Sequence, residues 1–165
     1  MSLALAPTEL RGFILTRHWR DLPDGTELEY WLATDEGAKK VLLNRQTSVA
    51  FLPALHRAAA QTSLAILQGL EVKELDLKTF DQQPVLGVYA RRFRDLGKLT
   101  RALQPLGIPL YEADVRPHDR YLMERFITAG VLVEGGQREG STILDGRLKP
   151  CLLYTSPSPR DLSTS

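Results

Sequence analysis

Four basic side chains at helical spacing are the residues of this sequence that are best placed to do chemistry. They are Arg91, Arg94, Lys98 and Arg101, and we call them the basic stripe. Within a predicted helix over residues 91–106 they lie on one face, and a face of a single charge can bind phosphates through charge and counterion release. The other interpretation is a solvated surface, which every exposed helix needs. The sequence thus offers a candidate nucleic-acid contact and leaves both interpretations open.

Paired acidic residues are the second feature that could do chemistry, because two-metal phosphoryl transfer needs several carboxylates that converge. Glu74 and Asp76 are two residues apart, and so are Glu112 and Asp114, so that each pair would share one face of a strand. No other acidic residue has a spacing that would complete a metal site, and the three histidines are far apart in the sequence. We therefore expect no catalytic residue and no metal ligand in this chain.

The helix that carries the basic stripe also has an apolar face on the other side. Four apolar residues recur there at helical spacing, which predicts that this face packs against the core. They are Phe93, Leu96, Leu99 and Leu103. The helix is therefore expected to hold its cations outward and its leucines inward.

A further helix is predicted over residues 116–128. Arg120 and Glu124 are four residues apart in it and are expected to pair. Four apolar residues are expected to share its inner face and to pack in the core. They are Leu122, Met123, Phe126 and Ile127.

The remaining elements follow from turn residues and hydrophobic periodicity. Pro23-Asp24-Gly25 is typical of a hairpin turn, and the alternation of Leu28, Tyr30 and Leu32 after it predicts a half-buried strand. The expected strands cover residues 12–17, 28–32, 41–43, 49–52, 70–77, 84–90, 109–115, 131–134 and 141–149, and a first helix covers residues 53–68. The first four strands should form an antiparallel meander. The order of elements predicts an α+β fold with a mixed, mainly antiparallel sheet and about three helices.

Composition is that of a soluble globular domain. The 165 residues suit one domain, and 21 basic against 20 acidic residues give a net charge of only +1. This balance excludes a binder that acts through bulk positive charge, so any contact with nucleic acid must be local. We find no membrane span and no secretory signal in the sequence. The single cysteine, Cys151, excludes an intrachain disulfide and a cysteine-based zinc site, and fits a cytoplasmic location.

The last segment, CLLYTSPSPRDLSTS over residues 151–165, differs from the rest in composition. Its serine, threonine and proline content is typical of a flexible tail. Residues 151–161 also resemble, letter by letter, a translated sequencing adapter. We therefore predict a native domain over residues 1–150 and a non-native, disordered tail over residues 151–165.

Several segments resemble, in the same order, the bacterial DNA polymerase II family, a branch of the family B DNA polymerases. Four of them are GFILTRHWRD (residues 12–21), YEADVRP (residues 111–117), RYLMERFIT (residues 120–128) and RLKP (residues 147–150). With shorter blocks they cover nearly all of the chain before the tail. The resemblance implies a family B N-terminal domain, which in the parent enzyme precedes a 3′–5′ exonuclease domain and the polymerase domains.

The resemblance also implies what this chain does. The parent would be a DNA-directed DNA polymerase of repair and lesion bypass that uses Mg²⁺, while the exonuclease and palm motifs of the family are absent from this sequence. The fragment would be a non-catalytic module, without a cofactor, whose partners are the single-stranded DNA template and the missing exonuclease and polymerase domains. The basic stripe would touch template or a neighbouring domain. A stand-alone single-stranded nucleic-acid-binding module and a pure docking domain remain as alternatives.

Overall fold

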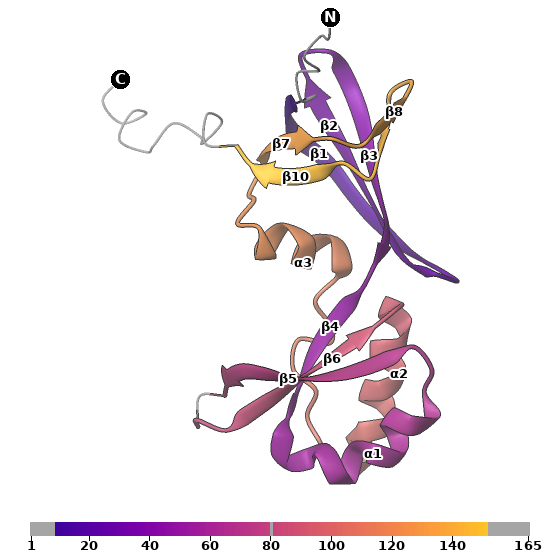
Figure 1. The fold of residues 1–165 in the computed structure, drawn as a ribbon, viewed down its shortest axis with the longest axis vertical. Helices are drawn as coiled ribbons and strands as arrows, with labels where there is room; N and C mark the ends of the chain where they lie inside the picture. Colours follow the sequence, from indigo (N-terminus) through magenta and orange to yellow (C-terminus); the bar gives the residue numbers. More distant parts are fainter. Residues whose placement is uncertain (1–8, 80, 152–165) are drawn as a thin grey trace, which may run out of the picture. The chain divides into compact units, whose positions relative to one another are not determined.

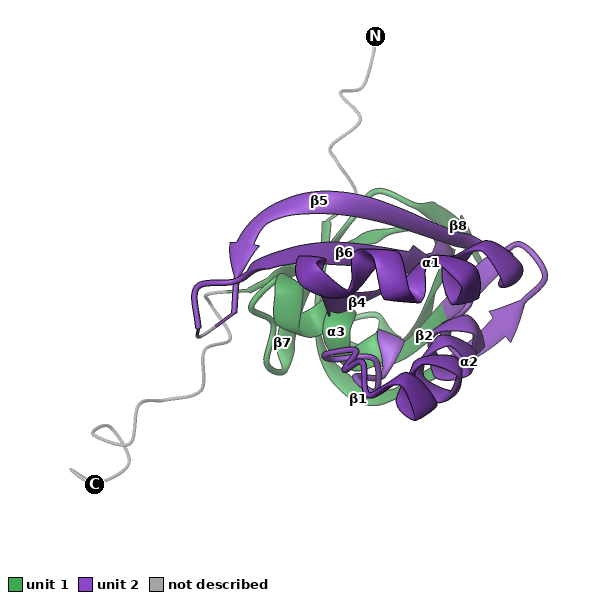
Figure 2. Cartoon of the chain, turned by 90° about the horizontal axis from the view of Figure 1, so that it is seen from below, with its two compact units in different colours: residues 1–18, 28–44, 118–165 green, residues 19–27, 45–117 purple. Residues whose placement is uncertain are grey.

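The computed structural model describes residues 9–79 and 81–151. These residues form an α+β fold of two sheets and three α-helices, shown in Figure 1, so the predicted fold class is confirmed. The chain divides into two compact units, each assembled from segments that are far apart in the sequence (Figure 2). Unit 1 comprises residues 1–18, 28–44 and 118–165, and unit 2 comprises residues 19–27 and 45–117.

The larger sheet has seven strands and contains most of unit 1. In order across the sheet they are β10 (Arg147–Pro150), β7 (Gly130–Glu134), β1 (Glu9–Leu22), β2 (Gly25–Thr34), β3 (Gly37–Gln46), β9 (Thr142–Leu144) and β8 (Gln137–Glu139). The predicted hairpin joins β1 to β2, with Pro23 and Asp24 in its turn. The predicted alternation is also confirmed, because Leu28, Tyr30 and Leu32 are at most 1% exposed.

Helix α3 (Pro117–Glu124) packs on this sheet through tyrosine side chains. The Tyr30 hydroxyl donates to the carbonyl oxygen of His118 at 2.6 Å, and the rings of Tyr30 and Tyr121 lie 6.0 Å apart. The Tyr121 hydroxyl in turn accepts the N–H of Leu148 at 3.3 Å. Two phenols with apolar rings and satisfied hydroxyls thus attach the helix to the larger sheet.

The segment over residues 141–149 forms two strands where the sequence predicted one. Asp145 interrupts it with a left-handed backbone, φ 54°, and is fixed there because its N–H donates to the Leu42 carbonyl at 2.8 Å. Its Oδ1 also accepts the N–H of Asn44 at 3.1 Å. Before this point β9 pairs parallel with β3, and after it β10 pairs antiparallel with β7. The larger sheet therefore contains both parallel and antiparallel strand pairs.

The smaller sheet lies in unit 2 and is antiparallel, in the order β4 (Ser48–Pro53), β6 (Pro84–Ala90) and β5 (Leu70–Lys78). The expected meander therefore holds for β1 to β3 only, since β4 belongs to a second sheet. The helices of this unit are α1 (Arg57–Ile66), after a 3-10 turn at Ala54–His56, and α2 (Phe93–Leu103), before a 3-10 turn at Gln104–Leu106. Leu96, Leu99 and Leu103 are buried in its core, with Phe93 partly buried beside them, which confirms the predicted apolar face.

The strand predicted over residues 109–115 is absent from the structure. A single bridge pairs Tyr111 with Phe51, and residues 112–114 form a turn. Glu112 takes a left-handed φ of 60°, which ends any extended run at that residue. Glu112 and Asp114 therefore do not share the face of a strand, contrary to the prediction.

Helix α3 is shorter than the predicted helix over residues 116–128. It ends at Glu124 because Phe126 takes a left-handed φ of 57°. Leu122 and Ile127 are buried as expected. The prediction was wrong for the other two residues, because the exposed fraction is 59% for Met123 and 86% for Phe126. For Phe126 the reason is that helical spacing does not extend past the end of the helix, whereas Met123 lies within the helix on a side that does not face the core.

Candidate nucleic-acid interface

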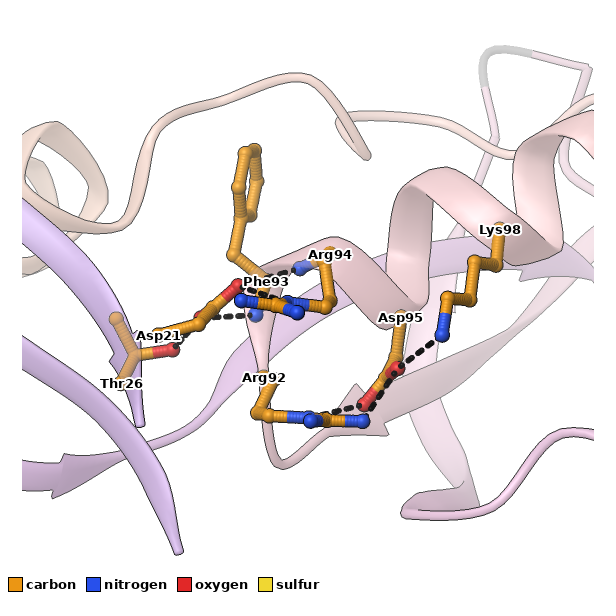
Figure 3. A network of polar contacts seen from close by, with 7 residues as sticks. All are labelled: Asp21, Thr26, Arg92, Phe93, Arg94, Asp95 and Lys98. Atoms are coloured by element: carbon orange, nitrogen blue, oxygen red, sulfur yellow. Dashed lines mark hydrogen bonds and ion pairs between the residues drawn. The ribbon is translucent and has the colours of Figure 1, made fainter. Parts of the chain in front are cut away.

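The start of α2 is held by a carboxylate from the tip of the β1–β2 hairpin, which belongs to unit 2 together with the helix. The N–H groups of Phe93 and Arg94 donate to Oδ1 and Oδ2 of Asp21 at 2.9 and 3.0 Å (Figure 3). The residue at the cap position, Arg92, is extended and makes no capping hydrogen bond with its side chain. Asp21 therefore caps the helix in its place, and its charge favours the positive end of the helix.

Asp21 is itself fixed in position and charged. Its side chain is nearly fully buried, and the Thr26 hydroxyl donates to Oδ1 at 2.8 Å. Burial acts to raise the pKa of this carboxyl, but the hydrogen bonds from Arg94, Thr26 and Phe93 outweigh it and hold the pKa below its ordinary value. The ring of Trp19 meets that of Phe93 edge to face at 4.9 Å, which adds apolar contact at the same point.

All four residues of the basic stripe are exposed. Arg91 lies two residues before α2, and the other three lie on the helix, on the side away from its buried leucines. The predicted exposure of the stripe is confirmed and three of its members lie on the helix, but Arg91 lies outside the helix that was predicted to begin with it. Whether the stripe contacts nucleic acid is a separate question, which depends on how its charges are paired.

Ion pairs divide the stripe into two inner and two outer members. Arg94 Nε lies 3.4 Å from Asp21 Oδ2. Lys98 Nζ lies 3.9 Å from Asp95 Oδ1. The outer members, Arg91 and Arg101, form no side-chain ion pair within the part of the chain that the structure describes. The outer members thus offer uncompensated charge to a phosphate.

Sequence reasoning missed the role of Asp95, which is buried in the first turn of α2. Arg92 contacts both of its carboxylate oxygens, with Nε and one terminal nitrogen at 3.4 Å (Figure 3). Residues 91–101 nevertheless carry five basic residues against this one acidic residue, so the local excess stays positive. The role of Asp21 was missed as well, because it lies 72 positions before Phe93 and no local pattern links them.

One cavity of about 590 Å³ lies within unit 2, apart from the basic stripe. Its lining residues are Phe51, Leu77, Lys78, Thr79, Asp81, Gln82, Val85, Tyr111 and Glu112. Backbone hydrogen bonds of 2.8 and 2.9 Å between Phe51 and Tyr111 fix its aromatic wall. More than half of these lining residues are polar or charged, and no motif in the sequence pointed to the cavity.

The described residues do not fit a metal ion. Across residues 9–79 and 81–151, His, Cys, Asp and Glu side chains nowhere gather in groups of three or more that could ligate one. Glu74 and Asp76 are both exposed on β5.

No helix within residues 9–79 and 81–151 has the length and apolar character needed to cross a membrane.

Comparison with family models gives two adjacent matches. Residues 12–47 match the family described as DNA polymerase II, N-terminal, and residues 48–108 match the one described as DNA polymerase II, insertion domain. The second match begins within β4 and lies entirely inside unit 2. The strands β1 to β3 and the smaller sheet are thus parts that the family models also distinguish.

Relatives are similar over most of this chain but over a small part of their own length. DNA polymerase II of Escherichia coli (strain K12) is 53% identical over 146 residues, which are 88% of this chain and 18% of that protein. The solved family B DNA polymerase of the hyperthermophilic archaeon Pyrobaculum calidifontis has a TM-score of 0.67 at 21% identity, over 85% of this chain and 20% of that one. The archaeal likeness concerns the fold. The chain spans about a fifth of the length of these relatives.

Proposed function

Because the chain belongs to the DNA polymerase II family over residues 12–108, we propose that it is a non-catalytic N-terminal module of a DNA-directed DNA polymerase. The observation that carries this proposal is the 53% identity to Escherichia coli DNA polymerase II over 146 residues. The module would guide the single-stranded template and brace the exonuclease and polymerase domains. Its place in the molecule would therefore be structural, with chemistry done elsewhere in a longer chain.

The whole enzyme would transfer nucleotides to a primer in the cytoplasm, with Mg²⁺ as its cofactor, and would serve repair and lesion bypass with a 3′–5′ exonuclease. The described residues do not fit a metal ion, so the Mg²⁺ ligands would belong to domains outside this chain. No step of the reaction is assigned to any residue here. The isolated chain is expected to extend no primer and to degrade no DNA when Mg²⁺ is supplied.

The basic stripe is the surface that we propose for the template. Its inner members, Arg94 and Lys98, are oriented by buried carboxylates, so their positions are set before any ligand arrives. Its outer members, Arg91 and Arg101, are free of ion pairs among the described residues and would contact phosphates. Contacts of this kind position a strand without reading its sequence.

The test is binding of a fluorescent thymidine oligonucleotide to the isolated chain, followed by anisotropy over a range of salt concentrations. Each phosphate contact on a single strand contributes about 0.7 to the slope of log affinity against log salt. Reversing Arg91 and Arg101 to glutamate should weaken binding by at least about tenfold and reduce that slope by about half.

The matched control reverses two exposed basic residues of the same unit that lie outside the stripe, Arg57 and Lys73. It changes the net charge by the same amount and should leave most of the affinity in place. Equal losses in the two double variants would show that bulk charge binds the strand. Absence of any salt-dependent binding would leave docking as the function of the stripe.

A stand-alone single-stranded nucleic-acid-binding module is the alternative function. Such a module needs aromatic side chains that are open for base stacking beside its cations. The aromatic residues nearest to the start of α2, Trp19 and Phe93, pack against each other and are only partly exposed. The alternative would be favoured if the isolated chain bound DNA as tightly as a chimeric polymerase that carries it.

A further inference from the structure

The residue that ends α3 has a backbone conformation that is unfavourable for its residue type. The N–H of Ile127 donates to the Leu122 carbonyl at 2.9 Å, and the N–H of Phe126 donates to the Met123 carbonyl at 3.1 Å. These are the two hydrogen bonds of a Schellman motif, whose left-handed position is usually occupied by glycine. Here it is Phe126, with φ 57°, and a side chain with a Cβ is strained in that conformation.

The strain is not offset by packing of the aromatic ring. Phe126 is 86% exposed, the largest exposed fraction among the large apolar residues that the structure describes. Met123, three residues earlier, is 59% exposed. A phenylalanine that is both strained and exposed stabilises neither the backbone nor the core of unit 1, which makes it a candidate for a contact outside unit 1.

The path of the chain after β10 points to that partner. The N–H of Cys151 donates to the Gly130 carbonyl at 3.3 Å, so the polypeptide that follows β10 starts beside the first residue of β7. Only three residues separate Phe126 from Gly130 in the sequence. A domain tethered there would have a high effective concentration at the exposed ring. The Escherichia coli relative continues well beyond the matched stretch, which is 18% of its length.

We propose that Phe126, supported by Met123, anchors a docking surface for the domain that follows this region in a full-length polymerase. This proposal rests on the proposed function and gives the bracing role a specific contact. A rigid aromatic ring that enters a pocket of its partner is the usual kind of residue that dominates an interface, and a methionine beside it adapts to the partner's shape. Phe126 would then be kept for association at the expense of the unit's own stability.

The test uses a chimeric Escherichia coli DNA polymerase II whose matched stretch is replaced by that of this chain. Protease digestion measures how fast the N-terminal module is released, and Phe126→Gly should speed release by at least about tenfold. The same substitution in the isolated chain should raise Tm by about 2–4 °C, because glycine removes the strain. A residue with a merely structural role would not give effects of opposite sign.

Two further variants make the result decisive. Met123→Gln should speed release to a smaller extent, and Ile66→Gln, at a position 71% exposed in unit 2, should leave it unchanged. Unchanged release in Phe126→Gly, or equal release in Ile66→Gln, would overturn the proposal. Self-association of the isolated chain that Phe126→Gly abolishes would overturn it too, in favour of a second copy. Primer extension by the unsubstituted chimera tests the proposed function separately, and DNA binding by the stripe variants does not depend on Phe126.

Discussion

The helices α2 and α3 end in the same hydrogen-bond pattern with different residues at its left-handed position. After α2 and its 3-10 turn that residue is Gly107, with φ 69°, and after α3 it is Phe126, with φ 57°. In both cases the isoleucine that follows is buried and donates to a buried leucine, at 3.3 Å and at 2.9 Å. The first end follows the local rule and the second departs from it.

This difference separates what a sequence needs for folding from what it keeps for another purpose. Glycine takes the left-handed conformation without strain, whereas phenylalanine in that position is strained by roughly 1–2 kcal/mol. Helix α2 also has its start capped by Asp21 and its cations directed outward. The C-terminal end of α2 therefore agrees with the local rule, and the left-handed residue after α3 that departs from it is where we place an interface.

The largest effect is expected from the buried leucines that accept these hydrogen bonds, Leu103 in α2 and Leu122 in α3. Each Leu→Ala substitution should lower the free energy of unfolding by about 2–5 kcal/mol, through lost burial and the cavity left behind. Urea denaturation of the isolated chain measures both. Similar losses would confirm that the two helix ends pack alike. A loss below about 1 kcal/mol at either leucine would contradict the comparison.

Removal of the cap on α2 should have the next largest effect. Asp21→Ala should cost about 1–2 kcal/mol of stability, since it leaves the N–H groups of Phe93 and Arg94 without their acceptor. Asp21→Asn keeps one acceptor oxygen and should cost less. Thermal unfolding followed by circular dichroism measures the difference, and equal stability in Asp21→Ala would show that the cap contributes nothing.

The pH dependence of stability follows from the same carboxyl group. The pKa of Asp21 is lower in the folded chain than its ordinary value of 3.8, so its contribution is complete above that value and is lost as the pH falls through the folded-state pKa. Tm should therefore fall between neutral pH and about pH 3 by more in the unsubstituted chain than in Asp21→Asn. Parallel pH profiles for the two proteins would contradict the assignment of this charge.

Single substitutions at the two left-handed positions test the comparison of the helix ends most specifically. Gly107→Ala should destabilise the isolated chain by about 1 kcal/mol, and Phe126→Gly should stabilise it by a similar amount. Space is not the cause in the first case, because a Cβ at Gly107 would meet no atom within 4 Å. Chemical denaturation of both variants measures whether each substitution raises or lowers the free energy of unfolding. Two changes of the same sign would remove the argument that Phe126 is strained.

The smallest effect is expected at the one ion pair within α3 that the sequence predicted. Arg120 and Glu124 approach to 3.8 Å, as their spacing indicated. Because Glu124 is exposed, Glu124→Gln should change the free energy of unfolding by less than about 0.5 kcal/mol. Denaturation in low and high salt would measure it, and a change several times larger would mean that this pair is coupled to more of the helix end.

Local patterns predicted the parts of the fold in which neighbouring residues decide the outcome. The turn at Pro23 and Asp24, the alternation after it and the two faces of α2 all follow from residues close together in the sequence. Contacts over long distances were not predictable in this way. Asp21 caps a helix that begins 72 residues later, and Asp145 is fixed by hydrogen bonds to β3, about a hundred positions earlier. Both depend on tertiary structure that has no local signal.

The candidate site shows the same limit. The exposure of Arg91 and Arg101, and the position of Arg101 on the outer side of α2, could be predicted from spacing alone. The pairing of Arg94 and Lys98 with buried carboxylates could not, because it depends on where other elements lie. Phe126 was placed in the core because a helical period was continued past Glu124, where a left-handed residue ends it.

The most direct test of the central claim is primer extension by the chimera in which this chain replaces the matched stretch of Escherichia coli DNA polymerase II. The isolated chain is assayed beside it with the same primer, template and Mg²⁺. We predict that the chimera extends the primer and that the isolated chain does not. Extension by the isolated chain, or a folded chimera that extends no primer, would contradict the assignment of this chain as a non-catalytic N-terminal module.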